Sequence, residues 1–273
     1  MAAPSSAIVD TYSQAVSDLT TLAYRDLIDL VGSSRGRGPI AVREALEEYL
    51  PVLVDQYGVV AADLAAEYYV EARMSAGVTS RLMPAPAQWT IDGNRIESLI
   101  RWGVSPEFKQ SASTTEMLIG GGLQRLIYGG FRDEVRKNAG LDRTCYGYAR
   151  KPKPGCCAFC AMLATRVYTS KESARQVVGR EYSAAGLRRR ANGNYVTRTR
   201  GTQPLGEKYH DFCRCSTVPV FRTGEYADEW DDVRAVNPSA EEYVSAYAGA
   251  RNDGTGSTAD VLSRMRRDYG FTR

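Results

Sequence analysis

Cysteine and histidine residues form two short motifs whose spacing suits a metal ion. The first is Cys157-Ala-Phe-Cys160, and the second, His210-Asp-Phe-Cys213-Arg-Cys215, follows about fifty residues later. A Cys-x-x-Cys motif lets two thiolates converge on one tetrahedral ion, and a second group of imidazole and thiolate ligands completes the coordination. The spacing therefore predicts a zinc site built from Cys157, Cys160, His210, Cys213 and Cys215.

Five candidate ligands exceed the four positions of a tetrahedral zinc ion, so one of Cys213 and Cys215 is expected to be surplus. Four protein ligands leave no position for water, which predicts a structural rather than a catalytic zinc. The chain between the two motifs has few large apolar residues, and metal binding can supply the stability that apolar burial there does not. The alternatives are reduced buried cysteines and disulfides formed once the protein has left the reducing cytosol.

Catalysis has little support in the same residues. His210 is the only histidine, so mechanisms that need two histidines cannot be assembled within one subunit. Nothing distinguishes a nucleophile among the six cysteines. We interpret Cys156 as a flanking thiol that can substitute in the metal site, and Cys145 as a small buried residue.

Basic residues are concentrated in the segment that carries the cysteines. Between Arg143 and Arg222 there are 16 basic and 4 acidic residues, whereas the rest of the chain has 19 basic and 28 acidic residues. The net charge of +3 is therefore the sum of a strongly basic segment and acidic regions on both sides of it. Such a segment suits contacts with nucleic-acid phosphates or with an acidic protein surface. The residues expected to make these contacts are Arg188, Arg189, Arg190, Arg198 and Arg200.

Long helices are expected before residue 140, because apolar residues recur there at spacings of three and four. They span residues 5–31, residues 39–72, and a stretch from about 111–115 to 138. Gly32 and Gly140 are expected to end the first and third helices, and Pro51 to kink the second. Glycines at 58 and 120–122 are expected to loosen their helices, and Asp92-Gly93 to form a turn.

Beyond residue 140 the helical spacing disappears, which predicts a small α+β or loop-rich module. Two short amphipathic helices are expected at 239–248 and 258–267, joined by a flexible linker at 252–257. These helices either dock on a neighbouring protein as an arm or pack on their own chain. The expected fold is mainly α, with a long-helix region at 1–79, a linker and third long helix at 80–140, a basic Cys/His module at 141–222 and a C-terminal helical arm at 223–273.

The module contains the stretches Tyr148-Ala-Arg-Lys-Pro-Lys-Pro-Gly155, Cys157-Ala-Phe-Cys160-Ala-Met-Leu-Ala164, Tyr209-His210-Asp-Phe-Cys213-Arg-Cys215 and Pro219-Val-Phe221. Leu123-Gln-Arg-Leu-Ile127 and Phe131-Arg-Asp-Glu-Val135 precede it. Together, over about residues 121–221, they resemble the MuF-like minor capsid proteins of tailed bacteriophages, in the form common in phages of actinobacteria. The added Cys156 and the arginine-rich insertion around 188–200 depart from that family's pattern.

The resemblance implies a structural, non-enzymatic virion protein of low copy number, made in the host cytoplasm and acting in head assembly at the portal vertex or the inner capsid surface. The implied partners are the portal protein, the major capsid protein and, without sequence specificity, the packaged double-stranded DNA. No membrane is expected, because the chain lacks both a secretory signal and an uncharged apolar run of about 18 residues. The alternatives are a capsid maturation protease, a metal-dependent nuclease or toxin, and a zinc-dependent DNA-binding protein.

Overall fold

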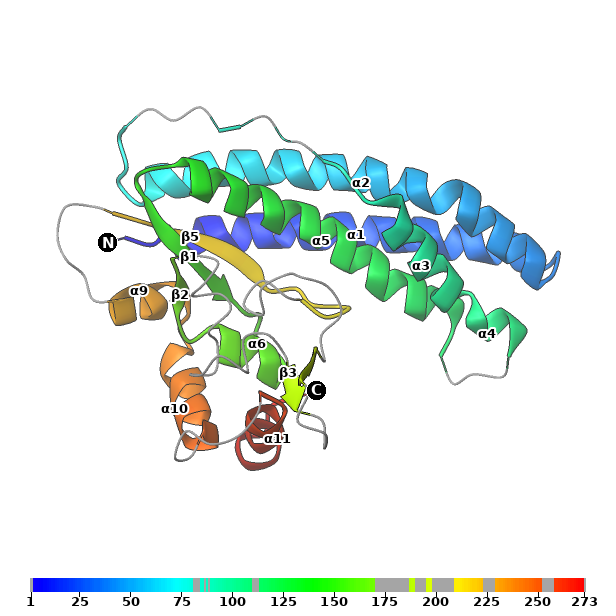
Figure 1. Ribbon diagram of the computed structural model, residues 1–273. Helices are drawn as coiled ribbons and strands as arrows, with labels where there is room; N and C mark the ends of the chain where they lie inside the picture. The colour runs from blue at the N-terminus through cyan, green and yellow to red at the C-terminus, as the bar shows by residue number, and fades with distance from the viewer. Residues whose placement is uncertain are drawn as a thin grey trace.

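Three long helices lie side by side and form one layer of the molecule (Figure 1). They are α1 (Ser6–Arg35), α2 (Pro39–Ser75) and α5 (Thr115–Leu141). This computed structural model describes residues 2–80, 84–85, 87, 89–109, 113–169, 187–189, 195–197, 209–222, 229–251 and 258–272. Within these ranges the chain is mostly helical, which confirms the predicted fold class. No helix in the same ranges is both long and apolar enough to cross a membrane.

The starts of the long helices follow local sequence rules. The hydroxyl of Ser5 accepts a hydrogen bond from a backbone N–H in the first turn of α1, which satisfies one of the donors left over at a helix start. Pro39 is the first residue of α2, where its missing N–H leaves no hydrogen bond unmade. α2 then continues through Pro51 as one helix.

The long helices run further than the glycines predict. α1 continues past Gly32 because Val31 and Ser34 on either side of it are buried, and their packing outweighs a cost of about 1 kcal/mol for one helical glycine. α5 likewise includes Gly140 and ends at Leu141. The predicted stops at these two glycines are therefore wrong.

Other helical glycines make room for side chains of neighbouring segments. A Cβ atom at Gly58 of α2 would overlap the indole of Trp89, and a Cβ atom at Gly130 of α5 would overlap the same ring. Trp89 therefore fits between α2 and α5 because neither glycine has a side chain. Close helix contact, rather than a loosened helix, explains Gly58.

Two shorter helices, α3 (Gly93–Gly103) and α4 (Ser105–Phe108), follow α2. Asp92 accepts a hydrogen bond from the backbone of Asn94 at 3.0 Å and so caps the start of α3. Asp92-Gly93 is therefore a helix start, where the sequence predicts a separate turn.

A three-stranded antiparallel sheet packs beneath the long helices (Figure 1). Its strands are β1 (Cys145–Lys151), β2 (Val167–Tyr168) and β5 (Ser216–Phe221), in the order β2-β1-β5. All residues of β5 are buried, and Ala2 pairs with Phe221 at its end. β1 leads directly into the first cysteine motif, and β5 follows directly after the second, so the β1–β5 pairing brings the two motifs together.

A two-stranded ribbon, β3 (Leu187–Arg189) with β4 (Tyr195–Thr197), lies in the arginine-rich insertion. Arg188 and Arg189 are in β3. Arg190, Arg198 and Arg200 lie outside the described residues.

The main hydrophobic core continues across the domain boundary expected at residue 140. Apolar side chains of the long helices and of the sheet form one buried cluster, in which Val218, Val220 and Phe221 of β5 join α1, α2 and α5. The sheet is therefore built onto the helical layer, and the cysteine motifs are held at fixed positions relative to α5.

A second core lies around α6 (Ala158–Leu163). The helices α10 (Ala240–Arg251) and α11 (Thr258–Tyr269) pack on α6, and α9 (Glu229–Val236) packs near β1 and β2. The two C-terminal helices occur where the sequence predicts them, and they pack on their own chain (Figure 1). The linker expected at 252–257 lies outside the described residues.

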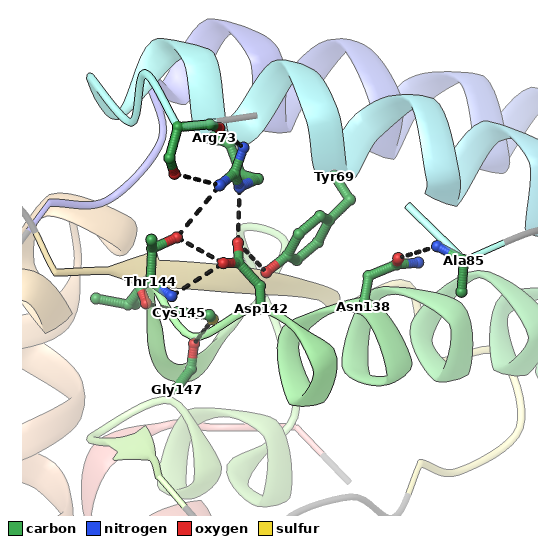
Figure 2. Close-up of polar contacts among 10 residues, drawn as sticks. Tyr69, Arg73, Ala85, Asn138, Asp142, Thr144, Cys145 and Gly147 are labelled. Atoms are coloured by element: carbon green, nitrogen blue, oxygen red, sulfur yellow. Dashed lines mark hydrogen bonds and ion pairs between the residues drawn. The ribbon is translucent and has the colours of Figure 1, made fainter. Parts of the chain in front are cut away.

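A buried ion pair joins the end of α2 to the junction between α5 and β1 (Figure 2). The guanidinium of Arg73 donates to the carboxylate of Asp142 at 2.6 Å, and both side chains are buried. The hydroxyl of Tyr69 donates to the same carboxylate at 3.2 Å, and Thr144 donates to it from both its N–H and its hydroxyl. This network fixes the direction in which β1 leaves the helical layer.

The Asp142 network makes stability sensitive to acid. Burial alone raises the pKa of Asp142, but hydrogen bonds from Thr144 and Arg73 outweigh it, so the pKa lies below its usual value. The stabilisation is therefore complete above the unfolded pKa of about 3.9 and is lost as the pH falls through the lower folded value. Chemical unfolding between about pH 2 and 5 is expected to show a stability loss that is smaller in Asp142→Asn, and equal acid slopes for the two proteins would contradict this expectation.

Candidate metal centre

The first cysteine motif is formed at the start of α6. Cys157 precedes the helix, and its Sγ accepts a hydrogen bond from the backbone N–H of Cys160 at 3.4 Å. This arrangement at a helix start places both sulfur atoms near one point. The N–H groups and the positive end of the helix dipole also favour the thiolate form there.

The second cysteine motif is formed by a tight turn before β5. The N–H of Cys213 donates to the carbonyl of His210 at 3.2 Å. Phe212 has φ of 60°, a left-handed conformation that an L-residue adopts at a cost of order 1 kcal/mol. An ion pair of 3.3 Å between Asp211 and Arg125 of α5 helps to hold the turn. Strain of this kind persists where surrounding contacts fix the backbone.

All five predicted ligand residues lie close together. The ligand atoms of Cys157, Cys160 and His210 lie within 4.8 Å of one another, as do those of Cys160, Cys213 and Cys215. The Nε2 of His210 is 3.1 Å from the Sγ of Cys157 and 3.7 Å from that of Cys160, and the Sγ atoms of Cys160 and Cys213 are 3.5 Å apart. Ligand atoms of a tetrahedral zinc ion are separated by about 3.6–3.8 Å, given Zn–S of about 2.3 Å. The spacing therefore fits an ion of this size, with Cys160 common to both groups.

The same contacts favour the thiolate form of two cysteines, Cys157 and Cys213. Hydrogen bonds with Cys160 and His210 lower the pKa of Cys157 to about 4. The bond with Cys157 raises the pKa of His210 to about 9, so without an ion the imidazole is protonated and a metal has to displace that proton. Hydrogen bonds from Cys160 and Cys215, with nearby guanidinium groups, lower the pKa of Cys213 below its usual value. Thiolates are the form in which cysteines bind metals. Neighbouring thiols and burial raise the pKa of Cys160 and Cys215, so metal binding to this cluster is expected to release protons and to weaken as the pH falls.

Two buried arginines contact the cysteine cluster. Arg132 of α5 is fully buried, and its guanidinium donates to the carbonyl of Cys215 at 2.7 and 2.9 Å and to that of Cys213 at 2.8 Å. Arg150 of β1 is also buried, and its Nη1 donates to the Sγ of Cys160 at 4.0 Å. The Cζ atoms of Arg132 and Arg150 lie 3.6 and 3.9 Å from the ring centroid of Tyr209.

The charge of these two guanidinium groups shows whether the surroundings of the cluster fit a metal centre. A buried cation is costly unless an anion or several acceptors compensate it. A zinc ion with three thiolates and an imidazole carries one net negative charge, and with four thiolates it carries two. Arg132 and Arg150 supply two positive charges directly beside the cluster. The charge around the cluster therefore fits an anionic metal–thiolate centre better than neutral thiols.

α5 closely approaches the turn that forms the second cysteine motif, which we call the metal-site turn, and the contact is at Gly121. A Cβ atom there would lie 2.8 Å from Cε2 of Phe212 and 2.9 Å from Cβ of Asp211. Its neighbours Gly120 and Gly122 similarly contact Tyr24 and Leu99. The glycine triplet is therefore a packing point of an unbroken helix, where the sequence predicts a weakness.

Substitution of Gly121 with alanine is expected to push the turn away from α5 and to cost about 1–3 kcal/mol in the free energy of unfolding. The control is Gly129→Ala on the same helix, where no atom lies within 4 Å of the added Cβ. That control is expected to stabilise the protein by about 0.5–1 kcal/mol, because glycine is a poorer helix former than alanine. Urea unfolding of both variants measures the two changes, and a stabilising Gly121→Ala would contradict the close approach.

The sequence patterns indicate no role in the metal site for Arg132, Arg150 or Gly121. Arg132 and Arg150 occur within stretches that carry the family resemblance, and Gly121 belongs to the triplet interpreted as a weakness. Cys156 packs beside the cluster as a half-buried thiol, whereas Cys145 lies in β1 and donates to the carbonyl of Gly147.

Comparison with known protein families identifies a match over most of the chain. A family model described as VG15 protein matches residues 3–246, which include the long helices, the sheet and the cysteine cluster. No curated protein and no solved structure matches the chain. The match is consistent with a phage protein, and the finer MuF-like assignment stays a prediction.

Proposed function

Since the chain belongs to the VG15 protein family, we propose that it is a structural minor capsid protein of a tailed phage. It acts in head assembly at the portal vertex or the inner capsid surface, with the portal protein and the major capsid protein as partners. The family match is consistent with a phage structural or morphogenesis protein, and the resemblance of residues 121–221 to MuF-like proteins supports the more specific role.

The arrangement of the metal site is the observation that carries the structural, non-catalytic part of this proposal. Cysteine and histidine ligands sufficient for four coordination positions lie together, backed by Arg132 and Arg150. A centre closed by four protein ligands stabilises a fold and leaves no position for a substrate. In the proposed protein, Cys157, Cys160, His210 and one of Cys213 and Cys215 hold a structural zinc ion, which joins the start of α6 to the turn before β5.

Quantitative mass spectrometry of purified particles of the encoding phage tests the proposal. The protein is expected in mature heads at a small fraction of the copy number of the major capsid protein. Infection with a phage that lacks the gene is expected to yield defective heads, and complementation with the wild-type chain restores them. Absence of the protein from particles would overturn the proposal.

A metal-dependent nuclease is a second candidate, because one hollow reaches the cluster. This hollow has a volume of about 290 Å³ and is lined by the exposed His210 and by all four clustered cysteines. An open metal position there would allow a bound water to attack a phosphodiester. Incubation of the zinc-loaded protein with supercoiled plasmid distinguishes the two: the structural proposal predicts intact plasmid, and the nuclease predicts nicking that Cys160→Ser abolishes.

A further inference from the structure

A second hollow, which we call the basic hollow, lies between the start of α1, the end of β1 and the start of α10. Its volume is about 440 Å³, and the side chains relevant here are Asp10, Ser13, Lys151, Lys153, Arg214 and Ser239. Three of these are basic and one is acidic. The volume is within the range of pockets that hold small organic ligands, so a phosphate group with its attached sugar has room to enter.

The positive charge of the basic hollow is only partly neutralised. Lys151 pairs with Asp10 at 2.8 Å. Lys153 and Arg214 take part in none of the ion pairs found in the part of the chain that the structure describes. Lys153 and Arg214 line both this hollow and the hollow beside the cysteine cluster, so the two cations lie near one another and repel. An anion between them would relieve this repulsion.

The basic hollow is made by well-packed elements. Lys153 follows β1, and Arg214 lies between two buried cysteines just before β5. The hydroxyls of Ser13 on α1 and Ser216 on β5 lie 2.5 Å apart at its wall. Arginine offers a planar fork that binds phosphate oxygens in pairs, lysine adds a point charge, and hydroxyls add further hydrogen bonds.

From this arrangement we propose that the basic hollow binds a phosphodiester group of double-stranded DNA, with Lys153 and Arg214 on its oxygens. The proposal rests on the proposed function only for the source of the DNA, which is the packaged genome. It also places a nucleic-acid contact on the described part of the basic segment, outside the arginine-rich insertion at 188–200. The site contacts backbone phosphates and therefore reads no base sequence.

Salt-dependent DNA binding tests the proposal. The probe is a fluorescein-labelled duplex of about 30 base pairs, titrated by anisotropy with the full-length zinc-loaded protein between ~50 and ~200 mM salt. Loss of two phosphate contacts in Lys153→Gln/Arg214→Gln is expected to reduce the slope of log K against log salt by about 1.8 and the affinity at least about tenfold. The control is Arg43→Gln, an exposed arginine on α2 outside the hollow, which is expected to leave the slope unchanged.

Each alternative outcome contradicts a defined part of the proposal. An unchanged slope in the double variant overturns the hollow as a DNA site. A calorimetric titration with inorganic phosphate that the double variant abolishes, together with unchanged DNA binding, identifies a free-phosphate site and overturns the DNA proposal. Unchanged zinc content and unfolding temperature show that the variant is folded. Because particle incorporation is measured separately, the head-protein proposal and this one can fail independently.

Discussion

Replacement of Cys160 with serine is expected to remove bound zinc and to lower the unfolding temperature by more than about 10 °C. Cys160 belongs to both groups of ligand atoms, so its loss damages either possible four-ligand set. Structural zinc ions supply folding free energy directly, and one kcal/mol corresponds to roughly 2–4 °C in a chain of this size. Loss of even half of a typical metal contribution therefore gives the expected shift.

The matched control is Cys145→Ser. Cys145 donates to backbone carbonyls in β1 and β5, which a serine hydroxyl can also do, and it belongs to neither ligand group. This variant is expected to keep about one zinc per chain by elemental analysis. Chelator treatment of the wild-type protein is expected to reproduce the unfolding temperature of Cys160→Ser. Full zinc occupancy and unchanged unfolding of Cys160→Ser would refute the metal centre.

Replacement of Arg132 with methionine is expected to cost about 3–5 kcal/mol, because it removes a buried charge next to an anionic cluster. It also leaves the carbonyls of Cys213 and Cys215 without the donors that they have in the wild-type protein. The metal affinity is expected to fall with the stability, since these carbonyls position the metal-site turn.

Arg125→Met provides the control for Arg132. Arg125 is on the same helix and also contacts the turn, but it is about half exposed and its ion pair with Asp211 is 3.3 Å long. An exposed pair of this kind contributes at most about 1 kcal/mol. Chemical unfolding with and without chelator separates charge from packing: if Arg132 balances the metal–thiolate charge, its substitution costs less in the metal-free protein. Equal costs in both forms would show that Arg132 acts through packing and its hydrogen bonds to the carbonyls, and not through the charge of a metal centre.

Periodicity and motif spacing were sufficient for two parts of the structure. The three long helices and the two C-terminal helices follow from apolar residues at three- and four-residue spacing, because that pattern has one stable way to bury its apolar face. The five candidate ligand residues can be picked out because Cys-x-x-Cys and His-x-x-Cys-x-Cys are short local patterns whose geometry depends little on the rest of the fold, and the structure places them close together.

The glycines show where local rules fail. Gly32, Gly58 and Gly121 have the same helix-weakening propensity when they are read one at a time, yet all three lie inside continuous helices. Gly58 and Gly121 are required by side chains from distant segments, Trp89 and Phe212. A single sequence carries no record of such neighbours, because propensity describes a residue in its own helix and not the element that packs on it.

The sequence by itself determined the class of the fold, the candidate ligand types and the separation of charge into a basic segment and acidic flanking regions. Only the tertiary structure decided that Arg132 and Arg150 contact the cysteine cluster, and that Lys153 and Arg214 line the same hollow. The physical reason is that the free energy of a charge depends on its burial and on what surrounds it. The pairing of β1 with β5 sets those surroundings by bringing together residues more than fifty positions apart.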